Sequence, residues 1–465
     1  MIMEVTEVLN IKLSARTTLL FMVGLLMVGI GAAHEKTYAA YNSVLQTSNK
    51  HYDAQIVNQT TPTKGYNLYT DGPYYTSSST RTADDNGYHY NNNFVRVMQT
   101  KQTKTGTYAK LRYFNKMLGW MNVHGIKSVS FNTIANSMMK QYNVMDTAVL
   151  ASAGATNTAT VSNGLANVTK NVLNAGDGSV VYPLASLQKA MTGAIVQQLI
   201  SAGQLSATTP LSKYYPAVPY SQSITVGELL SMTSGIDNTD VTPSSQLTEN
   251  QAYASMVKRL KSTGQNTYNY SDANFVLLAG IIAKVTGQSY TQNLKTRIFN
   301  KVGMKNTFVI NSKQPATKAT IATGYTYDGK NNYQDADTAS LARLSAIPGA
   351  GNLLSTPNDF YKFIQGLQNG QILTASQFQQ LTSYGSYYSG GLYVTKSGYK
   401  YNNGSFGGSS FHTSYYARND NYHMAIVFMN QYPLAGSSSA KAFTQKMYDV
   451  ATYYWEWRDA GSSGT

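Results

Sequence analysis

The sequence lacks cysteine altogether, and this absence excludes several classes of site. With no cysteine among 465 residues, a disulfide scaffold, a cysteine-ligated zinc or iron–sulfur site and a cysteine nucleophile are all excluded. Charged residues are also few, at 12% of the chain, whereas hydrophobic residues reach 42%. That hydrophobic fraction is sufficient for a substantial core, so extensive disorder is not expected. The length predicts two or three domains.

Acidic residues are scarce relative to basic ones. The chain has 22 Asp and Glu against 36 Lys and Arg, which gives a formal net charge of +14 and a pI near 9.4. A basic balance of this size indicates an acidic partner. Nucleic acid, anionic lipid and a phosphate-rich wall polymer all satisfy that condition.

The N-terminal pattern is typical of export. Lys12 and Arg16 precede an uncharged, largely apolar run from Thr17 to Ala33, as in a signal sequence. The run is long for a signal peptide and short for a membrane span, so residues 1–36 are interpreted as a signal peptide or a membrane anchor. Either places the remainder at the extracellular face of the cell envelope, secreted or anchored, which disfavours nucleic acid. Residues 37–60 are predicted to form a polar linker.

Residues 61–130 are predicted to form a small all-β barrel, because short alternating runs are separated by turn signals. Between residues 64 and 127, nine basic residues face three acidic ones. The Gly119-Trp120 dipeptide and the strands around it resemble the GW module, an SH3-like domain of Gram-positive surface proteins. The resemblance implies binding to a wall polymer, teichoic acid or peptidoglycan, with Trp120, Lys110 and Arg112 as candidate contacts. The alternative is a basic structural spacer.

Residues 131–458 mix helices and strands, and residues 459–465 form a tail. Strands are predicted near both ends of this region, around 147–163 and 391–429, with helices between them. This order predicts an α/β (α+β) arrangement in which the terminal strands could share one sheet.

A Ser-x-x-Lys tetrapeptide places a hydroxyl one helical turn from an amine. Such a serine can be a nucleophile if the surroundings keep the lysine amine neutral enough to act as the base. Context favours Ser186 and Lys189, because Pro183 interrupts any earlier helix and an apolar face at helical spacing follows. Ser186 would then lie at a helix N-terminus, where negative charge is stabilised. The tetrapeptide also occurs at Ser137, Ser255, Ser397 and Ser438, on ordinary amphipathic or loop segments.

The region resembles the serine β-lactamase-related and penicillin-binding enzymes of the class C type. The segments that carry the resemblance are ASLQKAMTGAIVQQLISAGQLSATTPLSKYYP, ITVGELLSMTSGI, YNYSDANFVLLAGIIAKVTGQSY, IFNKVGMKNT and GAGNLLSTPNDFYKFIQGL. This family includes D-alanyl-D-alanine carboxypeptidases and esterases. The resemblance implies a β-lactamase/transpeptidase-like fold, with an antiparallel sheet flanked by helices and an all-helical region.

The family's second and third motifs map onto this sequence with two departures. Tyr270 matches the motif tyrosine, implied to shuttle the serine proton, while Asp272 stands where asparagine is usual and could influence which substrate is accepted. In the third motif Asn402 replaces the basic residue that normally binds a substrate carboxylate. Gly404 matches the motif glycine, and the amide of Ser405 is implied to complete the oxyanion hole with that of Ser186.

These patterns predict an extracytoplasmic, wall-associated serine hydrolase that forms an acyl-enzyme on D-alanyl groups. The D-alanyl ester of teichoic acid and the D-Ala-D-Ala peptide stem both fit as substrates. The alternatives are a catalytically silent wall-binding pseudoenzyme and a β-lactamase. No metal-ligand cluster and no cofactor motif is apparent in the sequence.

Overall fold

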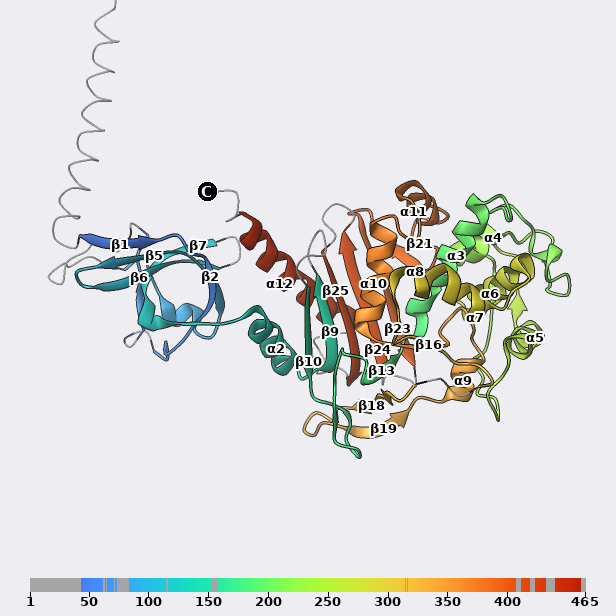
Figure 1. Cartoon of the computed structure of the whole chain (residues 1–465), viewed down its shortest axis with the longest axis horizontal. Helices are drawn as coiled ribbons and strands as arrows, with labels where there is room; N and C mark the ends of the chain where they lie inside the picture. The colour runs from blue at the N-terminus through green and yellow to red at the C-terminus, as the bar shows by residue number, and fades with distance from the viewer. Residues whose placement is uncertain are drawn as a thin grey trace, which may run out of the picture. The chain divides into compact units, whose positions relative to one another are not determined.

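A computed structural model describes most of the chain after the leader (Figure 1). The described residues are 43–61, 63, 65–70, 72, 83–113, 116–151, 158–313, 315, 317–406, 411–418, 423–431 and 440–460. The predicted leader, residues 1–36, lies outside them. Within the described ranges no helix is both long enough and apolar enough to cross a membrane. The chain divides into two compact units between Phe131 and Asn132.

The first unit is built on a six-stranded antiparallel sheet of order β7-β6-β5-β2-β8, with β1 paired to β5. Two of these strands lie within the stretch 37–60, so the expectation of a linker there is wrong for residues 44–56. Those residues are apolar at alternate positions of β2, which buries Ala54 and Ile56 in the core of the unit. The strands are β1 (Val44–Ser48), β2 (Tyr52–Ile56), β5 (Phe94–Thr103), β6 (Gly106–Tyr113), β7 (Lys116–Asn122) and β8 (Ile126–Ser128).

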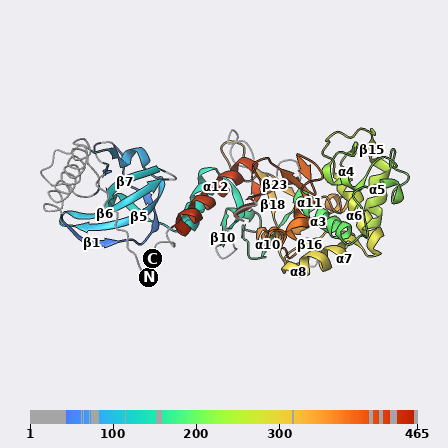
Figure 2. The same ribbon diagram turned by 90° about the horizontal axis from the view of Figure 1, so that it is seen from above.

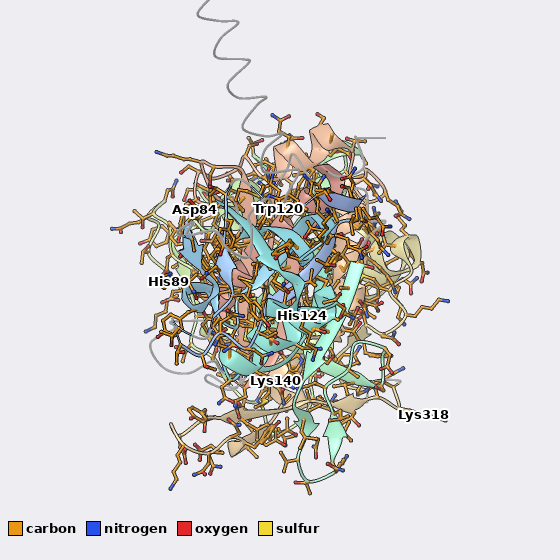
Figure 3. All side chains as sticks on the ribbon, turned by 90° about the vertical axis from the view of Figure 1, so that its left-hand side faces the viewer. Asp84, His89, Trp120, His124, Lys140 and Lys318 are labelled. Carbon is orange, nitrogen blue, oxygen red and sulfur yellow. The ribbon has the colours of Figure 1, made fainter. Side chains whose placement is uncertain are left out.

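The Gly119-Trp120 dipeptide has a structural cause. Gly119 has a φ of +105°, and a Cβ built there would lie 2.6 Å from the carbonyl oxygen of Tyr69, so only glycine fits. Trp120 then exchanges two backbone hydrogen bonds with Tyr69, of 3.1 and 2.8 Å. The Trp120 side chain, labelled in Figure 3, is only 5% exposed, beneath the Lys101 amine at 5.1 Å. As a core side chain, Trp120 cannot offer its ring to a polymer, which corrects its prediction as a contact.

The second unit contains a nine-stranded sheet of order β10-β9-β25-β24-β23-β22-β21, to which β18 and β19 are attached at β25. Strand β9 from the start of the unit pairs with β25 from its end, so the terminal strands share one sheet as predicted. The strands are β9 (Met145–Ala151), β10 (Thr158–Asn163), β18 (Thr323–Thr326), β19 (Gln334–Thr338), β21 (Tyr388–Ser389), β22 (Leu392–Val394), β23 (Tyr399–Phe406), β24 (Phe411–Arg418) and β25 (Met424–Gln431).

Helices flank this sheet and also form a separate helical region, which confirms the predicted fold class. Figures 1 and 2 show α2 (Phe131–Gln141) and α12 (Ala440–Ala460) on one side of the sheet, with the helical region beyond its other end. Helix α10 (Pro357–Gln368) packs on β9 and β25. In the helical region α3 (Lys189–Ser201) packs against α6 (Asp272–Thr286).

Helix α3 is more deeply buried than its sequence pattern suggests. Every residue from Lys189 to Gln197 is buried, and so is Leu199, so the helix is buried on all sides and lies in the core. Two glycines permit this packing. A Cβ at Gly193 would lie 2.2 Å from the carbonyl oxygen of Gly390, and one at Gly391 would lie 2.3 Å from the amide nitrogen of Ala190. The loop before β22 therefore lies directly against the start of α3.

Candidate active site

Ser186 lies in a 3-10 turn between a buried strand and α3. The strand is β13 (Val180–Pro183), and the turn η4 spans Ala185–Gln188. Ala185 has a φ of +48°, a left-handed conformation that an alanine adopts only when its surroundings impose it. Ser186 is half-exposed, whereas its neighbours in the turn are buried. The strained turn thus presents one hydroxyl to solvent at the beginning of a core helix.

The Lys189 amine is enclosed by three oxygen atoms. Nζ donates to Ser186 Oγ at 2.9 Å and to the carbonyl oxygen of Ala350 at 2.9 Å. It also forms an ion pair with Asp272 Oδ1 at 2.7 Å, while Lys189 itself is 0% exposed. Since an ammonium has three N–H donors, these three oxygens match its hydrogen-bonding capacity. The structure therefore brings Ser186 and Lys189 together as the sequence predicts.

The charge of this amine differs from the sequence expectation. Burial alone lowers the pKa of Lys189, but the carboxylate of Asp272, and after it Tyr270, overcome that effect, so the pKa is raised above its ordinary value. The resting amine is therefore an ammonium at neutral pH. To act as the base, the Lys189 amine must first lose one proton.

The Asp272 carboxylate contacts the Lys189 amine. Asp272 is the first residue of α6, where a carboxylate is favoured by the helix dipole. The start of α6 is fixed by Asn238, whose Oδ1 accepts from the backbone N–H of Ala273 at 2.9 Å and from Ser271 Oγ at 2.8 Å. The described partner of Asp272 is thus the Lys189 amine, and an influence of Asp272 on which substrate is accepted stays a prediction.

Tyr270 lies on the other side of the same amine. The Lys189 Nζ is 5.1 Å from the centre of the Tyr270 ring, and the electrostatic effect of Tyr270 is among those that raise the pKa of Lys189. The Tyr270 ring contacts Tyr388 edge-on at 5.8 Å and stacks on Tyr393 at 6.5 Å. These contacts fix the ring next to the amine, where a proton shuttle must lie.

Asn402 is turned inward. Its side-chain Nδ2 donates to the carbonyl oxygen of Ser186 at 2.9 Å and to that of Gly391 at 2.7 Å, and the side chain is fully buried. Both amide protons are therefore used within the protein, so Asn402 cannot bind a substrate group with them. The prediction that places it among substrate contacts is corrected to a positioning role. It ties strand β23 to the nucleophile turn.

The remaining third-motif residues lie further along β23. Gly404 is buried and Ser405 is exposed. The register of β22 with β23 ends at Tyr401, so in the described residues β22 does not pair with the part of β23 that carries Ser405. An unpaired strand edge can present its N–H groups to a ligand. The assignment of the Ser405 amide to the oxyanion hole stays a prediction.

Two backbone groups of the site were not anticipated from the sequence. Ala350 supplies a carbonyl oxygen to Lys189, and Gly391 supplies one to Asn402. Ala350 is brought near the nucleophile because β20 (Leu353–Ser355), which follows it, pairs with β13. The only sequence signals for these groups are the Gly349-Ala350-Gly351 and Gly390-Gly391 segments, which do not specify carbonyl direction.

Another Ser-x-x-Lys pair shows that this spacing alone does not bring the serine hydroxyl into contact with a buried lysine amine. Ser255 and Lys258 lie on α5 (Glu249–Arg259), but Lys258 is exposed. The hydroxyl of Ser255 accepts from Arg259 Nη1 at 3.0 Å. The same spacing therefore gives a surface serine and a solvated lysine when the helix is not buried. Across the described ranges no group of three or more His, Asp or Glu is placed to hold a metal ion.

Two family models match the sequence. The β-lactamase model matches residues 131–445, and the model of the GW (Gly-Tryp) dipeptide domain matches residues 46–127. Among characterised relatives, the putative penicillin-binding protein PbpX of Bacillus subtilis (strain 168) is 31% identical over 227 residues, 47% of this chain and 54% of that protein. The teichoic acid D-alanine hydrolase of Staphylococcus aureus is 27% identical over 258 residues, 54% of this chain and 62% of that protein. The match thus spans little more than half of each relative.

Solved structures show the same fold at low identity. FmtA from Staphylococcus aureus superposes with a TM-score of 0.58 at 21% identity, over 68% of this chain and 85% of that one. D-amino acid amidase from Ochrobactrum anthropi SV3, complexed with L-phenylalanine amide, gives a TM-score of 0.58 at 19% identity, over 70% and 98%. These similarities concern the fold.

Proposed function

Since this chain belongs to the family of serine β-lactamases and penicillin-binding proteins and carries a GW module, we propose that it is a wall-associated serine hydrolase that removes D-alanyl groups. The observation that carries the proposal is the contact of Ser186 Oγ with the buried Lys189 amine at 2.9 Å. A serine hydroxyl in contact with a basic group at the start of a helix is the arrangement needed for nucleophilic catalysis. The proposed location is the extracellular face of the envelope.

The proposed reaction uses four groups of the site. After the Lys189 amine has lost one proton, the Ser186 hydroxyl gives its proton to Lys189 as Oγ attacks the D-alanyl carbonyl carbon. The amides of Ser186 and Ser405 stabilise the resulting oxyanion. Tyr270 then delivers a proton to the leaving oxygen, which departs as an alcohol and leaves D-alanyl on Ser186. Water repeats the sequence in reverse and releases D-alanine.

The substrate we favour is the D-alanyl ester of teichoic acid. Recognition of a D-Ala-D-Ala stem requires a partner for its terminal carboxylate, and Asn402 is uncharged and directed inward. An ester leaving group carries no such carboxylate. The name of the Staphylococcus aureus relative, teichoic acid D-alanine hydrolase, agrees with this choice.

The direct test is to incubate the full chain with D-alanylated lipoteichoic acid and with a pentapeptide stem, and to measure free D-alanine. We expect release from lipoteichoic acid and little from the peptide. Release from neither substrate would contradict a D-alanyl hydrolase. Release from the peptide alone would contradict the ester assignment while leaving the nucleophile unaffected.

The first unit is proposed to hold the enzyme on its polymer by charge. Lys110 and Arg112 are half-exposed neighbours on β6, so their replacement by glutamine in a full-length Ser186→Ala chain should weaken lipoteichoic acid binding about threefold to tenfold at low salt. The difference should shrink in 1 M salt, because exposed charges are then screened. Replacing Lys258, an exposed lysine of the second unit, is the matched control. Binding that does not respond to salt would refute this mechanism.

Asp272 should set the pH dependence. Its carboxylate is the largest effect that raises the pKa of Lys189, so it moves the loss of the first proton to higher pH. With Asp272→Asn the rising limb of kcat/KM should move to lower pH, and the ratio of rates at pH 6 and pH 9 should increase at least about fivefold. Asp240→Asn is the control, since Asp240 pairs with Arg343 at 3.0 Å rather than with Lys189. If the rising limb of kcat/KM lay at the same pH in Asp272→Asn as in the native chain, the proposed role of Asp272 would be contradicted.

A further inference from the structure

A set of tyrosines extends from the Lys189 amine to the protein surface. It consists of Tyr268, Tyr270, Tyr387, Tyr388 and Tyr393, here called the tyrosine cluster. Neighbouring rings are close: Tyr268 and Tyr387 lie 5.2 Å apart, Tyr387 and Tyr393 5.4 Å, and Tyr388 and Tyr393 4.9 Å. Tyr270 joins the set through Tyr388 at 5.8 Å. These separations are typical of interacting aromatic pairs.

Exposure differs among the rings of the cluster. Tyr388 is 1% exposed, whereas Tyr268 is 40% and Tyr387 is 54% exposed. The backbone next to each exposed ring is held: the carbonyl oxygen of Tyr387 accepts from the N–H of Val394 at 3.0 Å, and Asn269 donates to Met232 at 2.9 Å. The backbone that carries the two exposed tyrosine rings is thus held in place. Binding of a ligand to these rings therefore requires little loss of conformational entropy in the protein.

The chemistry of these rings points to a polyhydroxylated ligand. A tyrosine ring offers a flat apolar face together with a hydroxyl group that donates and accepts hydrogen bonds. Sugar rings present C–H groups on one face and hydroxyls at their edges, which matches a pair of tyrosines. Asn402 uses both of its amide protons inside the protein. An uncharged leaving group therefore suits this side of the site better than a carboxylate.

We infer that Tyr268 and Tyr387 form a subsite for an uncharged sugar ring of the polymer that bears the D-alanyl ester. The inference rests on the proposed function, because it places the leaving group of that reaction. Ring contacts connect the subsite through Tyr388 and Tyr393 to Tyr270, the residue proposed to protonate the leaving oxygen. The subsite would act on substrate affinity and not on the chemical step.

The test compares a polymeric with a minimal ester in the full chain. Tyr268→Ala and Tyr387→Ala should each raise KM for glycosylated, D-alanylated lipoteichoic acid about tenfold, the equivalent of one lost aromatic contact, and the double variant should raise it further. The kcat should be unchanged, and so should both constants for D-alanine methyl ester. Free N-acetylglucosamine oligosaccharide should inhibit the native enzyme competitively and the double variant weakly.

Conservative variants of the two tyrosines, and a variant of a tyrosine outside the cluster, distinguish a loss of binding from a loss of folding. Tyr268→Phe and Tyr387→Phe retain the rings, so they should retain most of the affinity. Tyr220→Ala removes another tyrosine of the second unit, one that is 58% exposed and lies outside the cluster, and should have native constants. An unchanged polymer KM in the alanine variants would overturn the subsite, as would a reduced kcat on methyl ester. If the native chain hydrolyses neither ester, the proposed function itself fails.

Discussion

Ser186→Ala should lower D-alanine release from lipoteichoic acid by about 10⁴-fold or more, because no other group can form the acyl-enzyme. The loss should appear in kcat, since the substitution removes one oxygen atom from a half-exposed position and leaves the amides of the turn in place. The measurement is free D-alanine over time at saturating polymer. A second readout is the mass of protein quenched during turnover, where the D-alanyl adduct should be present only in the native chain.

Ser255→Ala is the matched control for this experiment. Ser255 has the same Ser-x-x-Lys spacing, but its hydroxyl contacts Arg259 and its lysine is exposed. It should retain native activity and thermal stability. If Ser186→Ala kept activity within tenfold of the native chain, the assignment of the nucleophile would be wrong. If Ser255→Ala lost as much, the loss would reflect general damage to the protein.

Tyr270→Phe should reduce kcat by about 10²- to 10⁴-fold, the usual contribution of a positioned proton-transfer group. The phenylalanine ring can keep the contacts with Tyr388 and Tyr393, so KM and the melting temperature should change little. The assay is the release of D-alanine from a D-alanyl ester across pH 6 to 10. Because Tyr270 also contributes to the raised pKa of Lys189, the rising limb in the variant should move toward lower pH.

A control variant distinguishes proton transfer from packing. Tyr393→Phe keeps a ring that stacks on Tyr270 and removes a hydroxyl that is not assigned to proton transfer. It should retain kcat within about threefold of the native value. A loss of less than tenfold in Tyr270→Phe would contradict the proton-transfer role, and equal losses in both variants would place the effect in the cluster as a whole.

How much could be predicted from the sequence differs between the two ends of the site. Ser186 was selected as the candidate nucleophile among five Ser-x-x-Lys pairs because local signals agree there: Pro183 precedes it and an apolar helix follows. Such signals depend on neighbours in the chain, which a sequence displays directly. The position of Tyr270 came instead from the family resemblance, since single tyrosines are uninformative in a chain with 37 of them.

The roles of Asp272 and Asn402 could not be read in the same way. Both positions were identified, and both were expected to meet substrate. Their partners are Lys189 and the carbonyl oxygens of Ser186 and Gly391, and Lys189 and Ser186 are distant in sequence from the residues they contact. Side-chain direction depends on how α6 and β23 pack against α3, and no local pattern encodes it. Trp120 was misjudged for the same reason, because the bridge from Tyr69 that buries it crosses about fifty residues of chain.

The sequence by itself determined the fold class and the family, through segments that resemble the penicillin-binding enzymes. It also selected the pair Ser186 and Lys189, because helix breakers and helical spacing are properties of contiguous residues. Only the tertiary structure decided the charge of that pair. Burial of α3 favours a neutral amine, yet Asp272 and the Ala350 carbonyl oxygen converge on it from two other segments. The pKa of a buried amine depends on which oxygen atoms the fold brings within about 3 Å of it. The order of residues in the sequence does not specify these distances.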